Sequence, residues 1–145
     1  MARRNKYLIR QLSIFSENRP GKLSTIAKAL KDEDINIFAF SIAEGAGYGV
    51  IRMIVDQPER AYDKLTKIGF VIKYTDVIAA QMDDHPGGLY EVTNILAEAS
   101  INIEYSYAYS GKKCATLIMR VEDPDKAVKR IVDKGGKLLE ASLFK

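Results

Sequence analysis

The sequence has very little of the residues that catalytic and metal centres use most often. It contains one cysteine, Cys114, one histidine, His85, and no tryptophan. A single cysteine excludes an internal disulfide and a cysteine metal cluster, and its apolar neighbours favour a packed thiol. His85 has no nucleophile or orienting partner close to it in the sequence, and no cluster of His, Cys, Asp and Glu has metal-ligand spacing. We therefore expect no catalytic residue, metal or cofactor, and predict that the protein is not an enzyme.

Long apolar runs and a strong charge of one sign are also missing. The net charge of +3 comes from 22 basic and 19 acidic residues spread along the chain. This charge is too small and too diffuse to indicate nucleic-acid or membrane binding. The N-terminus is not followed by an apolar segment with a small-residue cleavage site. With 47% apolar residues and no low-complexity tract, we expect a fully folded cytoplasmic protein.

The second half of the chain repeats the first at a constant offset of 66 positions, from Pro20 to Pro86. The register holds without a gap over about fifty positions, which chance does not explain, so the pattern indicates a tandem duplication. The aligned pairs include Gly21 and Gly87, Leu30 and Leu96, Ile35-Asn36-Ile37 and Ile101-Asn102-Ile103, Pro58 and Pro124, and Gly69 and Gly135.

Each repeat predicts the element order βαββαβ. Strands are expected at 8–15, 48–55 and 71–74, and at 77–82, 113–121 and 137–141, with a further strand from Ile35 or Ile101 to a glycine turn. The helices between them carry apolar stripes, expected at Leu23, Ile26, Ala27 and Leu30; Ala61, Leu65 and Ile68; Leu89, Val92 and Leu96; and Ala127 and Ile131.

This order predicts an α+β fold of two ferredoxin-like units in tandem, each an antiparallel sheet with both helices on one face. The domains are expected at residues 6–74 and 75–145. Because the other face of each sheet stays open, we expect the two units to pair with each other and with a second chain as a homodimer.

The glycine-rich segment 45–49 is interpreted as a hairpin turn. A phosphate loop is less favoured because no helix and no Lys-Ser or Lys-Thr follows it. Gly47-Tyr48-Gly49 on a ferredoxin-like third strand is also partly typical of RNA-recognition domains, but Val50 and Met53 stand where aromatic residues are wanted. RNA binding therefore stays an alternative, as does a docking module without a ligand.

Both repeats place a polar residue, an X-Pro step and a glycine directly before a helix, as Asn18-Arg19-Pro20-Gly21 and Asp84-His85-Pro86-Gly87. Such a loop can simply cap the helix, but backbone N–H groups at a helix start also bind carboxylates. Asn36 and Asn102 recur before the second strand, where we expect a buried polar side chain that needs a partner. An anion site beside mixed donors and acceptors suits an α-amino acid.

These segments resemble the ACT domain, the regulatory amino-acid-binding module of many biosynthetic enzymes. The similarity covers 17–23, 35–37 and 56–61, and again 86–89, 101–103 and 123–127. It implies a stand-alone tandem ACT protein that binds an amino acid between adjacent domains and regulates a separately encoded metabolic enzyme. The ligand-binding residues that it implies are Asn18, Arg19, Pro20, Gly21, Leu23, Asn36 and Ile37, and Asp84, His85, Gly87, Gly88, Leu89, Asn102 and Ile103.

The two repeats differ at one chemically important position of this loop. Asn18 can donate to a carboxylate and accept from an ammonium group, whereas an ionised Asp84 can only accept. The site built on Asn18 is therefore expected to be the principal one. The second site is expected to be weaker, empty or selective for a more cationic ligand. Ser16 and Met82 stand where family members often carry a histidine.

Overall fold

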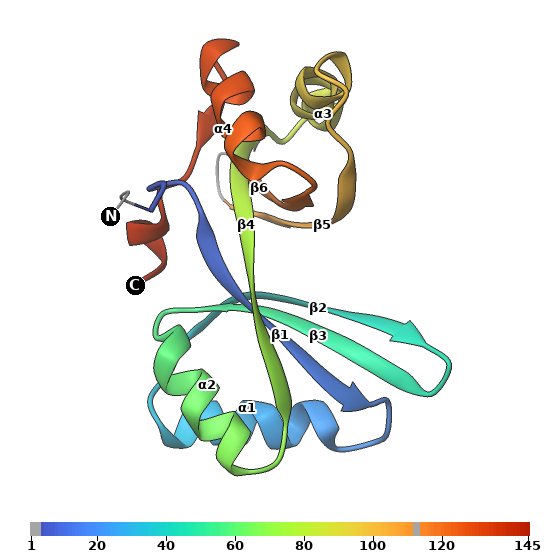
Figure 1. Cartoon of the computed structure of the whole chain (residues 1–145), viewed down its shortest axis with the longest axis vertical. Helices are drawn as coiled ribbons and strands as arrows, with labels where there is room; N and C mark the ends of the chain where they lie inside the picture. The colour runs from blue at the N-terminus through green and yellow to red at the C-terminus, as the bar shows by residue number, and fades with distance from the viewer. Residues whose placement is uncertain (1–3, 112–113) are drawn as a thin grey trace. The chain divides into compact units, whose positions relative to one another are not determined.

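The computed structural model describes residues 4–111 and 114–145. Within these residues the chain forms the βαββαβ order twice, which confirms the predicted α+β fold of two ferredoxin-like units (Figure 1). The elements are β1 (Ile9–Glu17), α1 (Lys22–Asp32), β2 (Ile37–Gly45), β3 (Tyr48–Val55), α2 (Pro58–Lys67), β4 (Val71–Asp83), α3 (Gly88–Glu98), β5 (Ile103–Ser110), β6 (Cys114–Val121), α4 (Pro124–Asp133), β7 (Lys137–Leu138) and the 3₁₀ helix η1 (Ala141–Phe144).

Two predicted strand boundaries are wrong. The strands expected at 71–74 and 77–82 are one continuous strand, β4, because the residues between them, Thr75 and Asp76, include neither the glycine nor the proline that would turn the chain. The strand expected at 137–141 ends at Leu138, and η1 follows, where the Ala141 N–H donates to the Lys6 carbonyl at 2.8 Å. The start of the strand expected at Lys113 lies outside the described residues.

The first repeat forms a sheet in the order β2-β3-β1-β4, with α1 and α2 together on one face (Figure 1). Alternation along β1 and β3 directs Leu12, Ile14 and Met53 to that face, where they are fully buried. Leu30 of α1 and Leu65 of α2 close the core from the helix side. This arrangement places the start of α1 beside the end of β1.

The second repeat forms the equivalent order β7-β4-β6-β5 under α3 and α4. Its core contains Ile78, Met119, Leu96 and Ile131, and the N-terminal segment contributes Tyr7 and Leu8 to its border. Half-buried Tyr105, Tyr107 and Tyr109 alternate with exposed residues on β5, as expected for one face of a partly buried strand.

The chain divides into two compact units whose limits differ from the ends of the repeats. One unit contains residues 10–75 with the C-terminal residues from Phe144, and the other contains the N-terminal segment up to Ile9 with residues 76–143. Phe144 packs edge-to-face against Phe38 of the first unit, with ring centroids 5.4 Å apart. Strand β4 contributes residues to both units.

Three residues expected in the apolar helix stripes are exposed instead. Ala27 lies on the outer face of α1, because the buried stripe runs through Ile26, Ala29 and Leu30. Leu89 (54% exposed) and Ile68 (45%) lie in the first turn of α3 and directly after α2, where the helix ends project past the core. Within the described residues, no helix has the length and hydrophobicity needed to span a membrane.

Candidate functional site

The loop between β1 and α1 presents backbone donors at the start of the helix. Gly21 is the N-cap at φ +89°, a left-handed conformation that a side chain would strain, and no side chain caps the helix. The N–H groups of Lys22 and Thr25 donate to Arg19 and Gly21 carbonyls, at 3.3 and 2.9 Å. Among the described residues, the N–H groups of Leu23 and Ser24 have no acceptor, so both donors are unpaired, as at many helix starts.

A cavity of about 110 Å³ lies beside these donors. The Asn18 N–H donates to the Gly47 carbonyl at 3.1 Å, which ties the loop to the β2–β3 turn. The Asn18 side-chain amide has no hydrogen-bond partner in the described part of the chain, whereas Arg19 forms an ion pair with Glu17 at 3.0 Å. The walls include Ser16, Asn18, Gly21, Leu23, Ile42 and Ile51.

Asn36 does not line this cavity, and the expectation that Asn36 and Asn102 are buried is wrong. Both are exposed, because each lies in the turn between a helix and a strand, where its backbone pairs with Asp56 or Glu122. Asn18 and Asn36 lie beyond opposite ends of α1, whose 11 residues span about 16 Å. Within one unit the two asparagines, and Ile37 after Asn36, are therefore too far apart to hold one small ligand.

The second repeat builds the same turn with different surroundings. Gly87 is the N-cap of α3 at φ +98°, and Asp84, His85 and Leu89 are exposed. Asn102 and Ile103 line a separate groove of about 440 Å³ along α3. As in the first repeat, the loop and the asparagine are not brought together.

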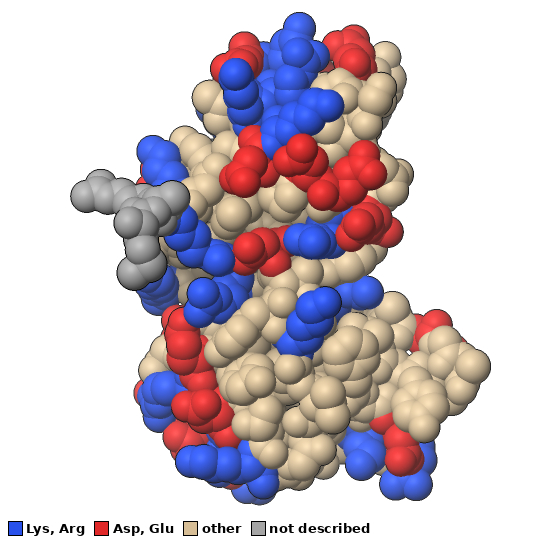
Figure 2. Space-filling view, in the orientation of Figure 1, with Lys and Arg blue, Asp and Glu red and all other residues tan. Residues whose placement is uncertain are grey.

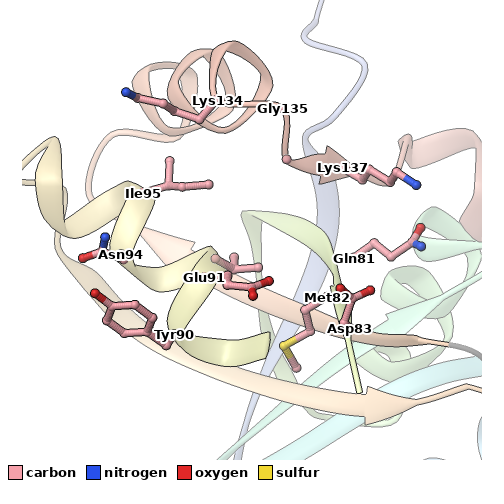
Figure 3. Close-up of a pocket in the computed structure, with 12 residues that line it drawn as sticks. Gln81, Met82, Asp83, Tyr90, Glu91, Asn94, Ile95, Lys134, Gly135 and Lys137 are labelled. Carbon is pink, nitrogen blue, oxygen red and sulfur yellow. The ribbon is translucent and has the colours of Figure 1, made fainter. Parts of the chain in front are cut away.

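A larger pocket, of about 590 Å³, lies between the end of β4, α3 and the α4–β7 turn (Figure 3). The equivalent space in the first repeat measures about 300 Å³, and it is lined by Lys22 and Phe70, at positions where the second repeat has Gly88 and Gly136. Sequence reasoning missed this pocket, although comparing the aligned repeats at these positions could have found it. Its lining includes Met82, Asp83, Glu91, Ile95, Lys134 and Lys137.

No cluster has metal-ligand spacing in the sequence, but the fold brings three residues of these types together. Ligand atoms of Asp83, His85 and Glu91 all lie within 4.8 Å of one another. The cluster joins a strand end, a loop and the first helical turn, so no short sequence motif signals it. The pKa of His85 is raised, chiefly by its hydrogen bond to the Pro86 carbonyl and further by Asp83 and Glu91, so this position favours positive charge.

The features relevant to RNA binding are incomplete. Tyr48 is 69% exposed at the start of β3, as a stacking platform requires. However, acidic and basic side chains are interspersed over the face shown in Figure 2, which does not present one continuous basic surface.

The chain matches a known family and resembles several solved structures. A family model described as "ACT domain pair" matches residues 7–142. The protein BT0572 of Bacteroides thetaiotaomicron is 35% identical, with a TM-score of 0.90, and the match covers 94% of each chain. The regulatory subunit of aspartate kinase from Thermus thermophilus is 15% identical, with a TM-score of 0.68, over 89% of this chain and 95% of that one, which shows the shared fold. A search of curated proteins finds no match.

Proposed function

Because the chain belongs to the ACT domain pair family, we propose that it is a non-catalytic regulatory protein that binds a small α-amino acid. The observation that carries this proposal is the cavity at the start of α1, which is lined by Leu23 and Ser24, with unpaired backbone N–H groups, and by Asn18, with an unpaired side-chain amide. The N–H groups of Leu23 and Ser24 hold the ligand carboxylate, and the Asn18 carbonyl accepts from its ammonium group.

The ligand lies where one ACT-like domain meets another, of the same or a second chain. The cavity of 110 Å³ has walls from the first repeat alone, and it is small for a pocket that encloses its ligand. Asn36, which is exposed and remote from the loop of its own unit, then contacts the ligand in a facing domain. Residues of that domain, such as Ile37, complete the wall.

The regulated partner is a separately encoded metabolic enzyme. The fold shared with the regulatory subunit of aspartate kinase supports this part of the proposal, since that protein is itself a subunit of an enzyme. Ligand binding at a domain interface gives a direct route to regulation, because it favours one arrangement of domains over another.

A thermal-shift screen against the common amino acids tests the proposed function. A ligand at a hundred times its dissociation constant should stabilise the chain by about 2.7 kcal/mol, which raises the melting temperature by several degrees. No response to any amino acid would favour a docking module without a ligand. Submicromolar, salt-sensitive affinity for single-stranded RNA, lost in Tyr48→Ala, would favour the RNA alternative.

Asn18→Ala should weaken binding of the best amino acid from this screen by about ten- to a hundredfold, because a lost hydrogen bond to a charged group costs roughly 1.5 to 3 kcal/mol. Asp84→Ala, the matched change in the second repeat, should have a much smaller effect. Calorimetric titration measures both. Equal losses, or a larger loss from Asp84→Ala, would place the principal site in the second repeat.

A homodimer is the expected assembly. Each unit is small, and β2 is the outer strand of its sheet, with exposed Phe40 among its residues. An uncovered strand edge with apolar side chains promotes association. Sedimentation equilibrium at micromolar concentration should give twice the chain mass of 16.2 kDa. A monomer both with and without amino acids would contradict this prediction.

A further inference from the structure

The end of β4 and the start of α3 hold three potential metal ligands side by side. Asp83 ends the strand, His85 lies in the loop, and Glu91 lies in the first turn of the helix. All three are exposed, and their ligand atoms lie within 4.8 Å of one another. A point between three such atoms is roughly 3 Å from each, so small side-chain rotations reach the ~2.0–2.2 Å typical of zinc ligands.

The hydrogen bonding of His85 presents a lone pair to this point. Its Nδ1 lies 2.9 Å from the Pro86 carbonyl oxygen, which can only accept, so Nδ1 carries the proton of the neutral ring. The Nε2 lone pair then faces the Asp83 carboxylate at 3.4 Å. When the ring is protonated, Nε2 donates to this carboxylate as an ion pair, and when the ring is neutral, the Nε2 lone pair is available to a metal ion. Metal-binding histidines in proteins are commonly oriented by such a bond from the other ring nitrogen to a backbone carbonyl.

The two carboxylates are held close despite their like charges. Gly88 at the start of α3 packs so tightly on the Asp83 carbonyl that a Cβ there would overlap it. Figure 3 shows Glu91 facing the strand that carries Asp83, whereas the side chains of Lys134 and Lys137 extend away from these carboxylates. Among the described residues, Asp83 has an ion pair only with His85, and Glu91 has none.

The first repeat shows that the turn does not need this cluster. Its equivalent residues are Glu17, Arg19 and Thr25, and Arg19 neutralises Glu17 at 3.0 Å. Helix α1 also starts without an acidic residue in its first turn. The second repeat thus exchanges a fixed cation for a titratable imidazole and adds a carboxylate, without changing the fold.

We propose that Asp83, His85 and Glu91 form a binding site for a divalent transition-metal ion of the zinc class. One imidazole and two carboxylates supply three protein ligands, and water fills the remaining position, as at an open zinc site. This inference is independent of amino-acid binding by the first repeat.

Zinc titration of the full, tag-free chain after chelator treatment tests the site. Calorimetry should give one zinc ion per chain, and the ring signals of the single histidine should shift in NMR spectra until that equivalent is bound. Glu91→Gln and His85→Gln should each weaken zinc binding at least tenfold. No saturable zinc binding, or unchanged affinity in both variants, would overturn the proposal.

Three controls keep the assignment specific. Glu17→Gln, the matched acidic position of the first repeat, and Cys114→Ser, which removes the one thiol, should leave zinc affinity unchanged, and a tenfold loss in either would overturn the assignment. Arg19→His combined with Thr25→Glu should create a second zinc equivalent. If the double variant still binds one zinc ion, three such side chains at this turn are not sufficient for a zinc site, and the proposal is contradicted.

Discussion

Leu30→Ala and Leu96→Ala should each lower the free energy of unfolding by about 2 to 5 kcal/mol, the usual cost of a large cavity in a core. The two leucines are aligned in the repeats, and both are fully buried, one in each core. Chemical denaturation followed by circular dichroism measures the loss.

Leu89→Ala is the matched control for these two variants. Periodicity placed Leu89 in the apolar stripe of its helix, but the side chain is exposed. The same chemical change should therefore alter stability by no more than about 0.5 kcal/mol. A loss at Leu89 as large as that at Leu96 would mean that the sequence-based stripe, and not the observed burial, describes α3.

Gly88→Ala should destabilise the protein by about 3 kcal/mol, the upper end of the usual cost of overpacking. The added methyl group would overlap the backbone carbonyl of Asp83, which cannot rotate away as a side chain could. Thermal or urea unfolding of the variant measures the effect.

Lys22→Ala provides the comparison at the aligned position of the first repeat, which already accommodates a side chain. This variant should lose no more than about 1 kcal/mol of stability, chiefly because the contact of the Lys22 ammonium group with the Phe70 ring, 6.0 Å from the ring centroid, is removed. Equal effects of the two substitutions would show that the close approach of Gly88 to Asp83 does not constrain the fold.

The fold was predictable because the same sequence pattern occurs in both repeats. Alternating and helical periodicities agreed between the repeats, and Pro58, Pro124, Gly69 and Gly135 marked the helix limits in both. The prediction failed at two strand ends. No turn residue separates the strands that merge as β4, and the C-terminal segment leaves the sheet after Leu138.

The candidate sites were less predictable, because their chemistry depends on distances that spacing does not give. The helix-start loops were recognisable from Gly21 and Gly87, whose left-handed backbone the sequence signals. The exposure of Asn36 was not predictable, since its place before the second strand suggested a buried polar side chain that needs a partner. The short distance between Glu91 and Asp83 depends on how closely α3 approaches the end of β4. Gly88 makes this close approach possible, but a glycine at that position does not by itself predict it.

The exchange of terminal segments between the units sets when each can be completed during synthesis. Phe144 packs on Phe38, so the unit of residues 10–75 lacks one of its aromatic contacts until translation reaches residue 144. Tyr7 and Leu8 border the core of the other unit, whose first core residue, Ile78, follows about seventy residues later, so they are made long before that core can form. We therefore expect the nascent chain to keep apolar surface exposed until translation passes residue 144, a period in which chaperones can bind it.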